Sequence, residues 1–177
     1  MNRFNLTLGL FLATQLPLVF ADAPIPMPQT CNDLIAVDTP DTRFTINADT
    51  TVTDNTTGLI WMRCALGQQS SNNTCDGPEQ SYTWQLALQA ADTATFAGYS
   101  DWRLPNVKEL ESLVENHCTS PAINLTVFPK APGAWFWSST PSIQNPQNAW
   151  VVNFLFGENT SSNKSTPSAV RLVRNIN

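Results

Sequence analysis

The sequence predicts an α+β domain in which two helices cover one side of an antiparallel sheet. Short runs rich in β-branched and aromatic residues stand at both ends of the domain, and two segments with helical periodicity lie between them. Near the C-terminus, residues 149–156 alternate at strand spacing. Strands that flank a block of helices are typical of the α+β class.

The chain begins with a pattern typical of a secretory signal peptide, which we predict over residues 1–21. Arg3 precedes an apolar run from Leu6 to Phe20, and small residues follow it. We expect cleavage after Ala21 or Ala23. The run is shorter than the roughly 20 apolar residues of a membrane-spanning helix. The sequence therefore predicts an exported protein without a membrane span, located in the periplasm, on the cell surface or outside the cell.

Residues 22–43 are predicted to form an extended arm laid over the domain, because they are rich in proline and lack periodicity. An even number of cysteines in an exported chain indicates disulfides, and this chain has four. Three pairings are open. The spacing favours Cys64–Cys75, which closes a local polar loop, and leaves Cys31 to join the arm to Cys118. Residues 44–177 then form a single domain.

The first strands of this domain are predicted to form a hairpin. The runs Thr51–Thr53 and Leu59–Met62 have strand composition, and the turn residues Asp54, Asn55 and Gly58 separate them. Glycine is expected at such a turn because it adopts positive φ without a steric penalty.

Two helices follow. The first is predicted from Trp84 to Thr93, because apolar residues recur at helical spacing and Thr83 stands at the capping position. The second is predicted from Val107 to Glu115, where Asn106 and Glu109 have the spacing of a capping box. Its apolar stripe consists of Leu110, Leu113 and Val114.

The last third of the chain is predicted to return to strands, over Trp135–Ser139, Ala149–Phe156 and Ala169–Arg174. Two polar segments, Pro141–Asn148 and Gly157–Ser168, are expected to be loops between them. These loops contain few charges and many Asn, Ser and Gln residues.

Composition excludes one class of partner and favours another. The net charge is −5 and the nine basic residues are spread thinly, so nucleic acid is not an expected partner. Charged residues make up only 13% of the chain, and six tryptophans are present. Such a surface is suited to hydrogen bonding and stacking, which favours binding over catalysis.

The residues that could carry catalysis or a metal are few. His117 is the single histidine, and we interpret it as a polar residue at a helix end, where the dipole favours a cation. Zinc is not predicted, because Cys64 and Cys75 are too far apart for a close ligand pair. Glu111 and Glu115 are expected on a solvated helix face rather than as the acid pair of a glycosidase. Calcium stays open, although no EF-hand spacing occurs.

Several motifs occur in an order that resembles a known family. They are TVTDNTTGLIWMRC at 51–64, YTW at 82–84, GYSDWRLPNVKEL at 98–110, FWSS at 136–139, AWVVNF at 149–154 and VRLVR at 170–174. Together they resemble the Lcl C-terminal domain family, a bacterial exported domain named after a collagen-like adhesin. The resemblance runs from about Phe44 to Arg174.

This resemblance implies a C-type-lectin-like fold, related to that of formylglycine-generating enzymes, in proteins associated with surface adhesion and with glycan or glycosaminoglycan binding. The sequence lacks the calcium signature of sugar-binding C-type lectins and a reactive cysteine pair for formylglycine chemistry. The positions that match the family's framework, and that we assign to the scaffold, are Asp54, Gly58, Trp61, Trp84, Trp102, Arg103, Leu104, Pro105, Glu109, Trp137, Ser138, Ser139, Trp150, Gly157 and Arg171.

Some domains of this kind are similar to the variable proteins of diversity-generating retroelements, whose substitutions concentrate in C-terminal strands and loops. By that similarity the candidate ligand-binding residues are Ser142, Gln144, Asn145, Gln147, Asn148, Asn153, Leu155, Glu158, Asn159, Ser162, Asn163 and Lys164. Trp135, Phe136 and Phe156 lie near them in the sequence, either to stack on a ligand or to pack in the core.

Three functions are consistent with these observations. The first is an exported ligand-binding or adhesion module for a glycan or glycosaminoglycan. The second is an accessory or structural subunit of a surface assembly that binds protein. The third and least favoured is an enzyme of the formylglycine-generating type, which requires reactive thiols or a metal.

Overall fold

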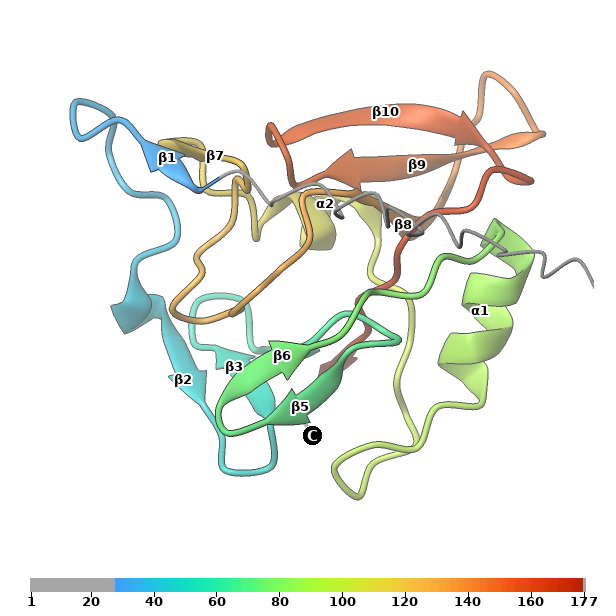
Figure 1. The fold of residues 1–177 in the computed structure, drawn as a ribbon. Coiled ribbons are helices and arrows are strands. Elements are labelled where there is room, and N and C mark those ends of the chain that lie inside the picture. Colours follow the sequence, from blue (N-terminus) through green and yellow to red (C-terminus); the bar gives the residue numbers. More distant parts are fainter. Residues whose placement is uncertain (1–27, 177) are drawn as a thin grey trace, which may run out of the picture.

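The computed structural model describes residues 28–176 (Figure 1). The predicted signal peptide, residues 1–21, and the first residues of the predicted arm lie outside this range. The elements in chain order are β1 (Thr30–Cys31), a 3-10 helix (Asp41–Arg43), β2 (Phe44–Ile46), β3 (Thr51–Asp54), β4 (Leu59–Met62), β5 (Gln69–Ser71), β6 (Thr74–Asp76), α1 (Trp84–Asp92), α2 (Val107–Glu111), β7 (Cys118–Thr119), β8 (Trp135–Pro141), β9 (Asn148–Asn153), β10 (Glu158–Asn163) and β11 (Val173–Asn175).

A four-stranded antiparallel sheet contains the predicted hairpin. Its strand order is β11-β4-β3-β2, and β3 and β4 are joined at Gly58, which has φ +69°. Val52 and Trp61 are register partners in this hairpin, and both side chains are fully buried. The predicted hairpin is therefore confirmed. These two side chains belong to one of the two hydrophobic core clusters.

A second sheet is three-stranded, in the order β10-β9-β8. The interpretation of residues 157–168 as a loop was wrong, because Glu158–Asn163 form β10 in antiparallel register with β9. The sequence of β10 is polar and lacks the alternation of apolar residues by which a strand is predicted. An edge strand with exposed faces does not need that alternation. β9 ends at Asn153, short of the predicted Phe156, because the Asn153 Oδ1 accepts a hydrogen bond of 2.6 Å from the Leu155 N–H and turns the chain.

The two helices differ in how well they match the prediction. α1 ends one residue before the predicted Thr93, but the Thr83 side chain makes no capping hydrogen bond. α2 has the predicted capping box between Asn106 and Glu109. It ends at Glu111, four residues earlier than predicted, because the chain after it pairs with another segment.

That pairing corrects the expected position of Glu115. The Glu115 N–H donates to the Ala122 carbonyl at 3.1 Å, and Val114 bridges to Ile123. Glu115 is consequently 2% exposed and not on a solvated helix face. His117, in turn, does not stand at a helix end, because α2 stops before it.

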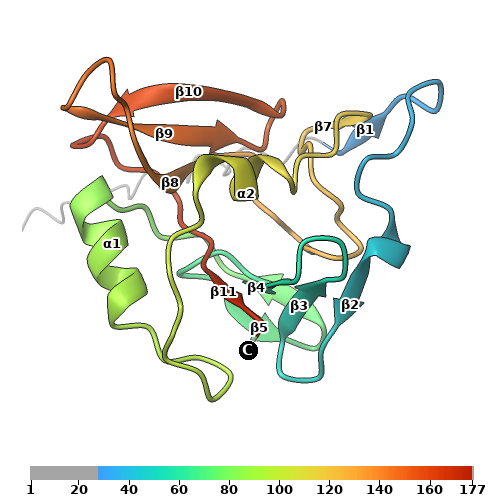
Figure 2. The same ribbon diagram turned by 180° about the vertical axis from the view of Figure 1, so that it is seen from behind.

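In place of the expected single sheet, the described strands form two main sheets and two two-stranded sheets, and residues of both main sheets contribute to the core. One buried cluster includes Trp61, Leu110 and Phe128, and a second includes Trp102 and Trp137. α2 contacts β8 and β9, and α1 lies at the side of the same sheet (Figure 2). This arrangement places the first turn of α1 close to the ends of the three-stranded sheet.

Two disulfides form in the pairing that the spacing favours, one between distant segments and one across a local loop. Cys31 bonds to Cys118 and thereby links β1 to β7, and Cys64 bonds to Cys75 in β6. The polar stretch between Cys64 and Cys75 forms the short β5–β6 hairpin. Of the helices in the described residues, none is long and apolar enough to cross a bilayer.

Candidate functional site

The candidate residues from the C-terminal loops do not form one continuous surface. Directly paired residues of β9 and β10 share a face, and neighbours along a strand alternate between faces. Asn159 is paired with Val152, while Ser162 is paired with Ala149, so Asn159 and Ser162 lie on opposite faces. The candidate set is therefore divided by the sheet itself.

Several of these residues serve the loops rather than a ligand. Ser142 and Asn153 are buried, and the Asn153 carboxamide forms the turn after β9. The Asn145 Oδ1 accepts the Gln147 N–H at 3.0 Å within its own loop. Asn159 donates to the Glu111 carboxylate of α2. Their polarity is thus largely used inside the fold.

Three of the candidates do converge, at a groove beside the first turn of α1. This Trp84 groove has a volume of about 520 Å³. Gln147 comes from the loop before β9, whereas Asn163 and Lys164 come from the end of β10 and the loop after it. The groove is lined by Thr83, Trp84, Gln85, Leu88, Gln147, Asn163, Lys164 and Ser165.

Backbone hydrogen bonds fix the walls of the groove. The Trp84 N–H donates to the Lys164 carbonyl at 2.9 Å, and the Lys164 N–H donates to the Gln147 carbonyl at 2.9 Å. Figure 1 shows the first turn of α1 beside the chain that follows β10. The three segments are thus joined by main-chain contacts, and substitution of the lining side chains leaves those contacts in place.

Trp84 is the best-positioned side chain in the groove. Its indole N–H donates to the Ser138 carbonyl at 2.8 Å, and the Lys164 Nζ lies 4.4 Å from the ring centroid. The Lys164 ammonium also donates to the Pro146 carbonyl at 2.8 Å. Trp84 and Lys164 therefore form a preorganised cation–π pair at the groove wall.

The two amides offer hydrogen-bonding groups to the groove. The Asn163 Oδ1 accepts both the N–H and the hydroxyl of Ser165, at 3.0 and 2.7 Å. Within residues 28–176, the amide nitrogen of Asn163 and the side-chain amide of Gln147 have no hydrogen-bond partner. Both groups are therefore available for a ligand with hydroxyl or carboxylate oxygens.

Lys164 is the one charged side chain among the residues that line the groove. Five of the basic side chains pair with carboxylates, and Arg63 and Arg171 are buried. Lys164 is thus the one cation of the described chain that is neither buried nor paired with a carboxylate. It stands in the groove, with no Asp or Glu among the lining residues.

The groove does not fit a calcium ion. Calcium takes six to eight oxygen ligands, usually with several carboxylates. The carboxamide oxygens of Asn145 and Asn163 already accept hydrogen bonds within their own turns, and the lining residues include no acid. The ammonium of Lys164 would also repel a cation.

The aromatic residues expected near the site have different environments. Phe136 is fully buried and packs edge-on against Phe154 at 5.2 Å, so it belongs to the core. Trp135 is half-buried, and Phe156 is 60% exposed in the turn between β9 and β10. Neither of these two lines the Trp84 groove.

The groove residues missing from the candidate set come mainly from the start of α1 and its N-cap, and Ser165, after β10, is missing as well. Thr83, Gln85 and Leu88 were interpreted only as parts of a helix, and Trp84 was assigned to the scaffold. The sequence contains one indication of this role, because a tryptophan at the start of a helix needs a hydrogen-bond acceptor for its indole N–H. Its partner Lys164 is distant in the sequence, so the pairing itself was not readable.

Antiparallel sheets, two helices and two disulfides define this protein as an α+β, disulfide-bonded domain. Within that class, the chain belongs to the Lcl C-terminal domain family, whose model matches residues 50–174. The family expected from the motifs is thereby confirmed. The matched range includes every residue of the Trp84 groove. A comparison with curated proteins gave no match.

Proposed function

We propose that this protein is an exported ligand-binding module that holds a glycan in the Trp84 groove and carries out no catalysis. The observation that carries the proposal is the convergence of Trp84, Lys164, Gln147 and Asn163 in one groove of about 520 Å³. An apolar aromatic wall with a few fixed polar groups is typical of a small-ligand site. Sugars combine apolar ring faces with hydroxyls, so they match such a lining.

The charge of the groove narrows the class of glycan. A heavily sulfated chain requires several cations, and Lys164 is the one available cation of the described residues. We therefore propose a neutral glycan or one with isolated carboxylates, such as a uronic acid, in preference to a highly sulfated glycosaminoglycan.

Export and a C-type-lectin-like fold are part of the same proposal. The signal-peptide pattern at residues 1–21 and the two disulfides support an oxidising location, because cytosolic thiols stay reduced. Membership in the Lcl C-terminal domain family supports the fold assignment and the association with surface adhesion.

The test is a binding array of neutral, uronate-containing and sulfated glycans, read with calcium and with a chelator. We expect binding to the first two classes without a calcium requirement. The double variant Gln147→Ala/Asn163→Ala is expected to weaken binding at least about tenfold, since each loses a polar contact to the ligand.

The matched control is the double variant Gln144→Ala/Thr160→Ala, which removes polar side chains from the same loop and sheet but outside the groove. It is expected to bind like the unmodified protein. Equal losses in both double variants, or binding to sulfated chains alone with a steep salt dependence, would contradict the groove assignment.

A protein ligand is the second candidate. Among residues 28–176, β10 pairs with β9 alone, and its other edge could accept an added strand. Ile143 is 98% exposed at the tip of the loop between β8 and β9, as befits an anchor for a protein surface. A blank glycan array, together with loss of protein binding in Ile143→Ser, would favour this function.

A further inference from the structure

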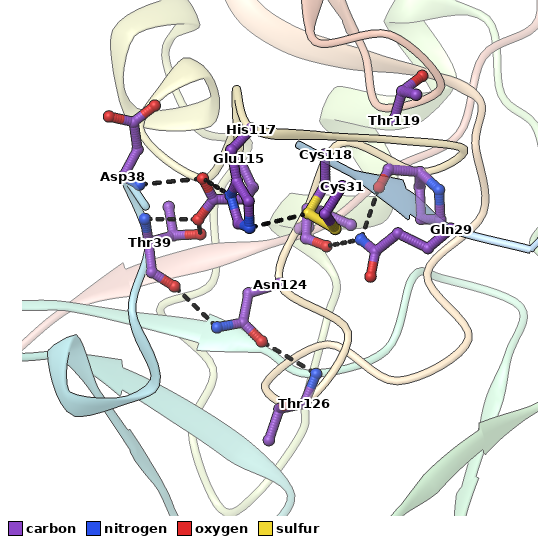
Figure 3. Close-up of a disulfide and its surroundings, with 12 residues drawn as sticks. Gln29, Cys31, Asp38, Thr39, Glu115, His117, Cys118, Thr119, Asn124 and Thr126 are labelled. Atoms are coloured by element: carbon purple, nitrogen blue, oxygen red, sulfur yellow. Dashed lines mark hydrogen bonds and ion pairs between the residues drawn. A yellow bond between two sulfur atoms is a disulfide. The ribbon is translucent and has the colours of Figure 1, made fainter. Parts of the chain in front are cut away.

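A second cluster of reactive side chains surrounds the disulfide that joins the N-terminal arm to the domain. The imidazole of His117 lies between Glu115 and this disulfide (Figure 3). Its Nδ1 is 2.6 Å from the Glu115 Oε1, and its Nε2 is 3.3 Å from the Cys118 Sγ. The three groups form a carboxylate–imidazole–sulfur row.

Glu115 is held firmly in its charged form. Burial alone would raise its pKa, but hydrogen bonds from the Thr39 hydroxyl, His117 and the N–H groups of Asp38 and Thr39 outweigh burial and bring the pKa to about 2. A carboxylate can only accept a hydrogen bond, so the proton of this contact is on the His117 Nδ1. The ring orientation is thereby fixed, with Nε2 facing sulfur.

An imidazole in this position assists the cleavage of a disulfide. Thiol–disulfide exchange is faster when the departing sulfur is stabilised as a thiolate. Protonated Nε2 of His117 would donate a hydrogen bond to the Cys118 Sγ as its negative charge develops.

Access to the disulfide is unequal for its two sulfur atoms. Cys31 is exposed, whereas Cys118 is 8% exposed. Both line an open pocket of about 470 Å³, together with Val37, His117 and Ile123. A thiol that enters this pocket reaches Cys31, and the leaving group is then Cys118, the sulfur next to His117.

We propose that the Cys31–Cys118 disulfide is an exchange site for thiols, with His117 as the group that stabilises the leaving thiolate and Glu115 as its positioning residue. An external thiolate attacks the Cys31 Sγ and forms a mixed disulfide there. The Cys31–Cys118 bond breaks, and its electron pair remains on the Cys118 Sγ. A second thiol then attacks the mixed disulfide, which leaves both protein cysteines reduced and two thiols joined as an oxidised disulfide.

Exchange alters the attachment of the arm. β1 and β7 pair over only two residues each, so the disulfide is the strongest link at this position. The other contacts of residues 28–43 with the domain are noncovalent, such as the hydrogen bonds of Gln29 to the carbonyls of Pro121 and Ile123 and the ion pair of Arg43 with Asp54. Opening the bond therefore converts a covalent attachment into a reversible one.

The protein contains its own control. Cys64–Cys75 is a second disulfide in the same chain, and the single histidine of the sequence lies at the first. Accessibility differs between the two disulfides, so a variant at His117 separates the effect of the imidazole from that of exposure. His117→Asn is suited to this, because its amide can replace the Nδ1–H contact to Glu115 while no donor faces Cys118.

The experiment treats oxidised protein with reduced glutathione at neutral pH, quenches with an alkylating reagent and follows each cysteine by peptide mass spectrometry. We expect Cys31–Cys118 to open at least about tenfold faster than Cys64–Cys75, with the first glutathione adduct on Cys31. In His117→Asn the opening of Cys31–Cys118 is expected to slow about tenfold, while the rate at Cys64–Cys75 and the thermal midpoint of the oxidised protein stay unchanged.

An unchanged rate in a folded His117→Asn protein would overturn the proposal. If that variant does not fold, the unmodified protein still decides, because first attack on Cys118 or equal rates at the two disulfides would contradict the assignment of His117 to the leaving thiolate.

Discussion

Glu115 shows how a single buried carboxylate organises one end of the molecule. Its oxygens accept hydrogen bonds from the N–H groups of Asp38 and Thr39 at 2.9 and 2.7 Å, and its other contacts are the Thr39 hydroxyl and His117. One side chain thus joins the arm to the segment after α2. Loss of its charge should weaken both connections together.

We predict that Glu115 makes the stability of the protein sensitive to acid. Its pKa falls from 4.5 to about 2 on folding, so the folded state binds fewer protons than the unfolded state between these values. The stabilisation is complete above about pH 4.5 and is lost as the pH falls towards 2. Unfolding at a series of pH values should show up to about 3 kcal/mol lost over this range.

The variant Glu115→Gln tests this prediction, because it cannot ionise. It should be less stable than the unmodified protein at neutral pH and should show a flatter decline below pH 4.5. Parallel pH curves for the two proteins would mean that another carboxylate causes the acid sensitivity.

Trp102 is predicted to be a structural tryptophan, in contrast to Trp84 at the groove. It is buried, packs against Phe96 with ring centroids 5.9 Å apart, and donates its N–H to the Phe96 carbonyl at 3.1 Å. Trp102→Ala should cost about 3–5 kcal/mol in the free energy of unfolding, measured by denaturant titration. Leu86→Ala is the control, because Leu86 lies at a half-exposed position of α1. It should lower the free energy of unfolding by well under 1 kcal/mol.

At the scale of elements, local signals were readable in the sequence and distant partners were not. The Asn106 capping box and the Gly58 turn depend on neighbours within a few residues, and both are found as predicted. The stripe of α2 suggested a helix to Glu115, but the pairing of Val114 with Ile123 ends it early. β10 was missed because its pairing with β9, and not its own pattern, makes it a strand.

The same difference between local and distant signals explains which residues of the candidate site the sequence identified. Polar loop composition identified Gln147, Asn163 and Lys164, because loops of that kind carry ligand contacts. It also included Ser142 and Asn153, which the fold buries. Burial and the partnership with α1 depend on the three-dimensional path of the chain, so composition alone does not separate these two groups.

The capping box of α2 gives a prediction of modest size. Asn106→Ala removes the hydrogen bond from the Glu109 N–H to the Asn106 Oδ1, which is 2.9 Å long. The expected cost is about 1 kcal/mol in the free energy of unfolding. Lys108→Ala is the control, since the Lys108 side chain is mostly solvent-exposed and its ion pair with Glu111 should contribute little. Equal effects of the two variants would show that capping does not stabilise this helix.

The turns of the two main hairpins should differ in their tolerance of a methyl group. Gly58 and Gly157 both have positive φ, at +69° and +80°. A Cβ on Gly58 meets nothing within 4 Å, whereas one on Gly157 would lie 2.7 Å from the Val114 Cγ1. Gly58→Ala should therefore cost about 1 kcal/mol from backbone strain alone. Gly157→Ala should cost about 1–2 kcal/mol more, because Val114 must shift.

At the scale of the whole molecule, the disulfides make unequal contributions because they close loops of very different length. Cys31 and Cys118 are separated by 87 residues, and Cys64 and Cys75 by 11. A cross-link stabilises mainly by reducing the entropy of the unfolded chain, and the reduction grows with the logarithm of the loop length. By that relation, loss of the first bond should cost roughly 4–5 kcal/mol and loss of the second about 3 kcal/mol.

The comparison of Cys31→Ser/Cys118→Ser with Cys64→Ser/Cys75→Ser measures this difference by denaturant unfolding. The larger loss of stability expected for the first pair requires that the arm stays docked without its covalent link. Contacts such as the 2.7 Å hydrogen bond from Asn124 to the Thr39 carbonyl would have to hold it. If the first pair costs less than the second, the arm leaves the domain while the core remains folded. Protease cleavage confined to the arm would then identify local undocking. In that case, thiol exchange at Cys31–Cys118 would control the exposure of the domain surface that the arm covers.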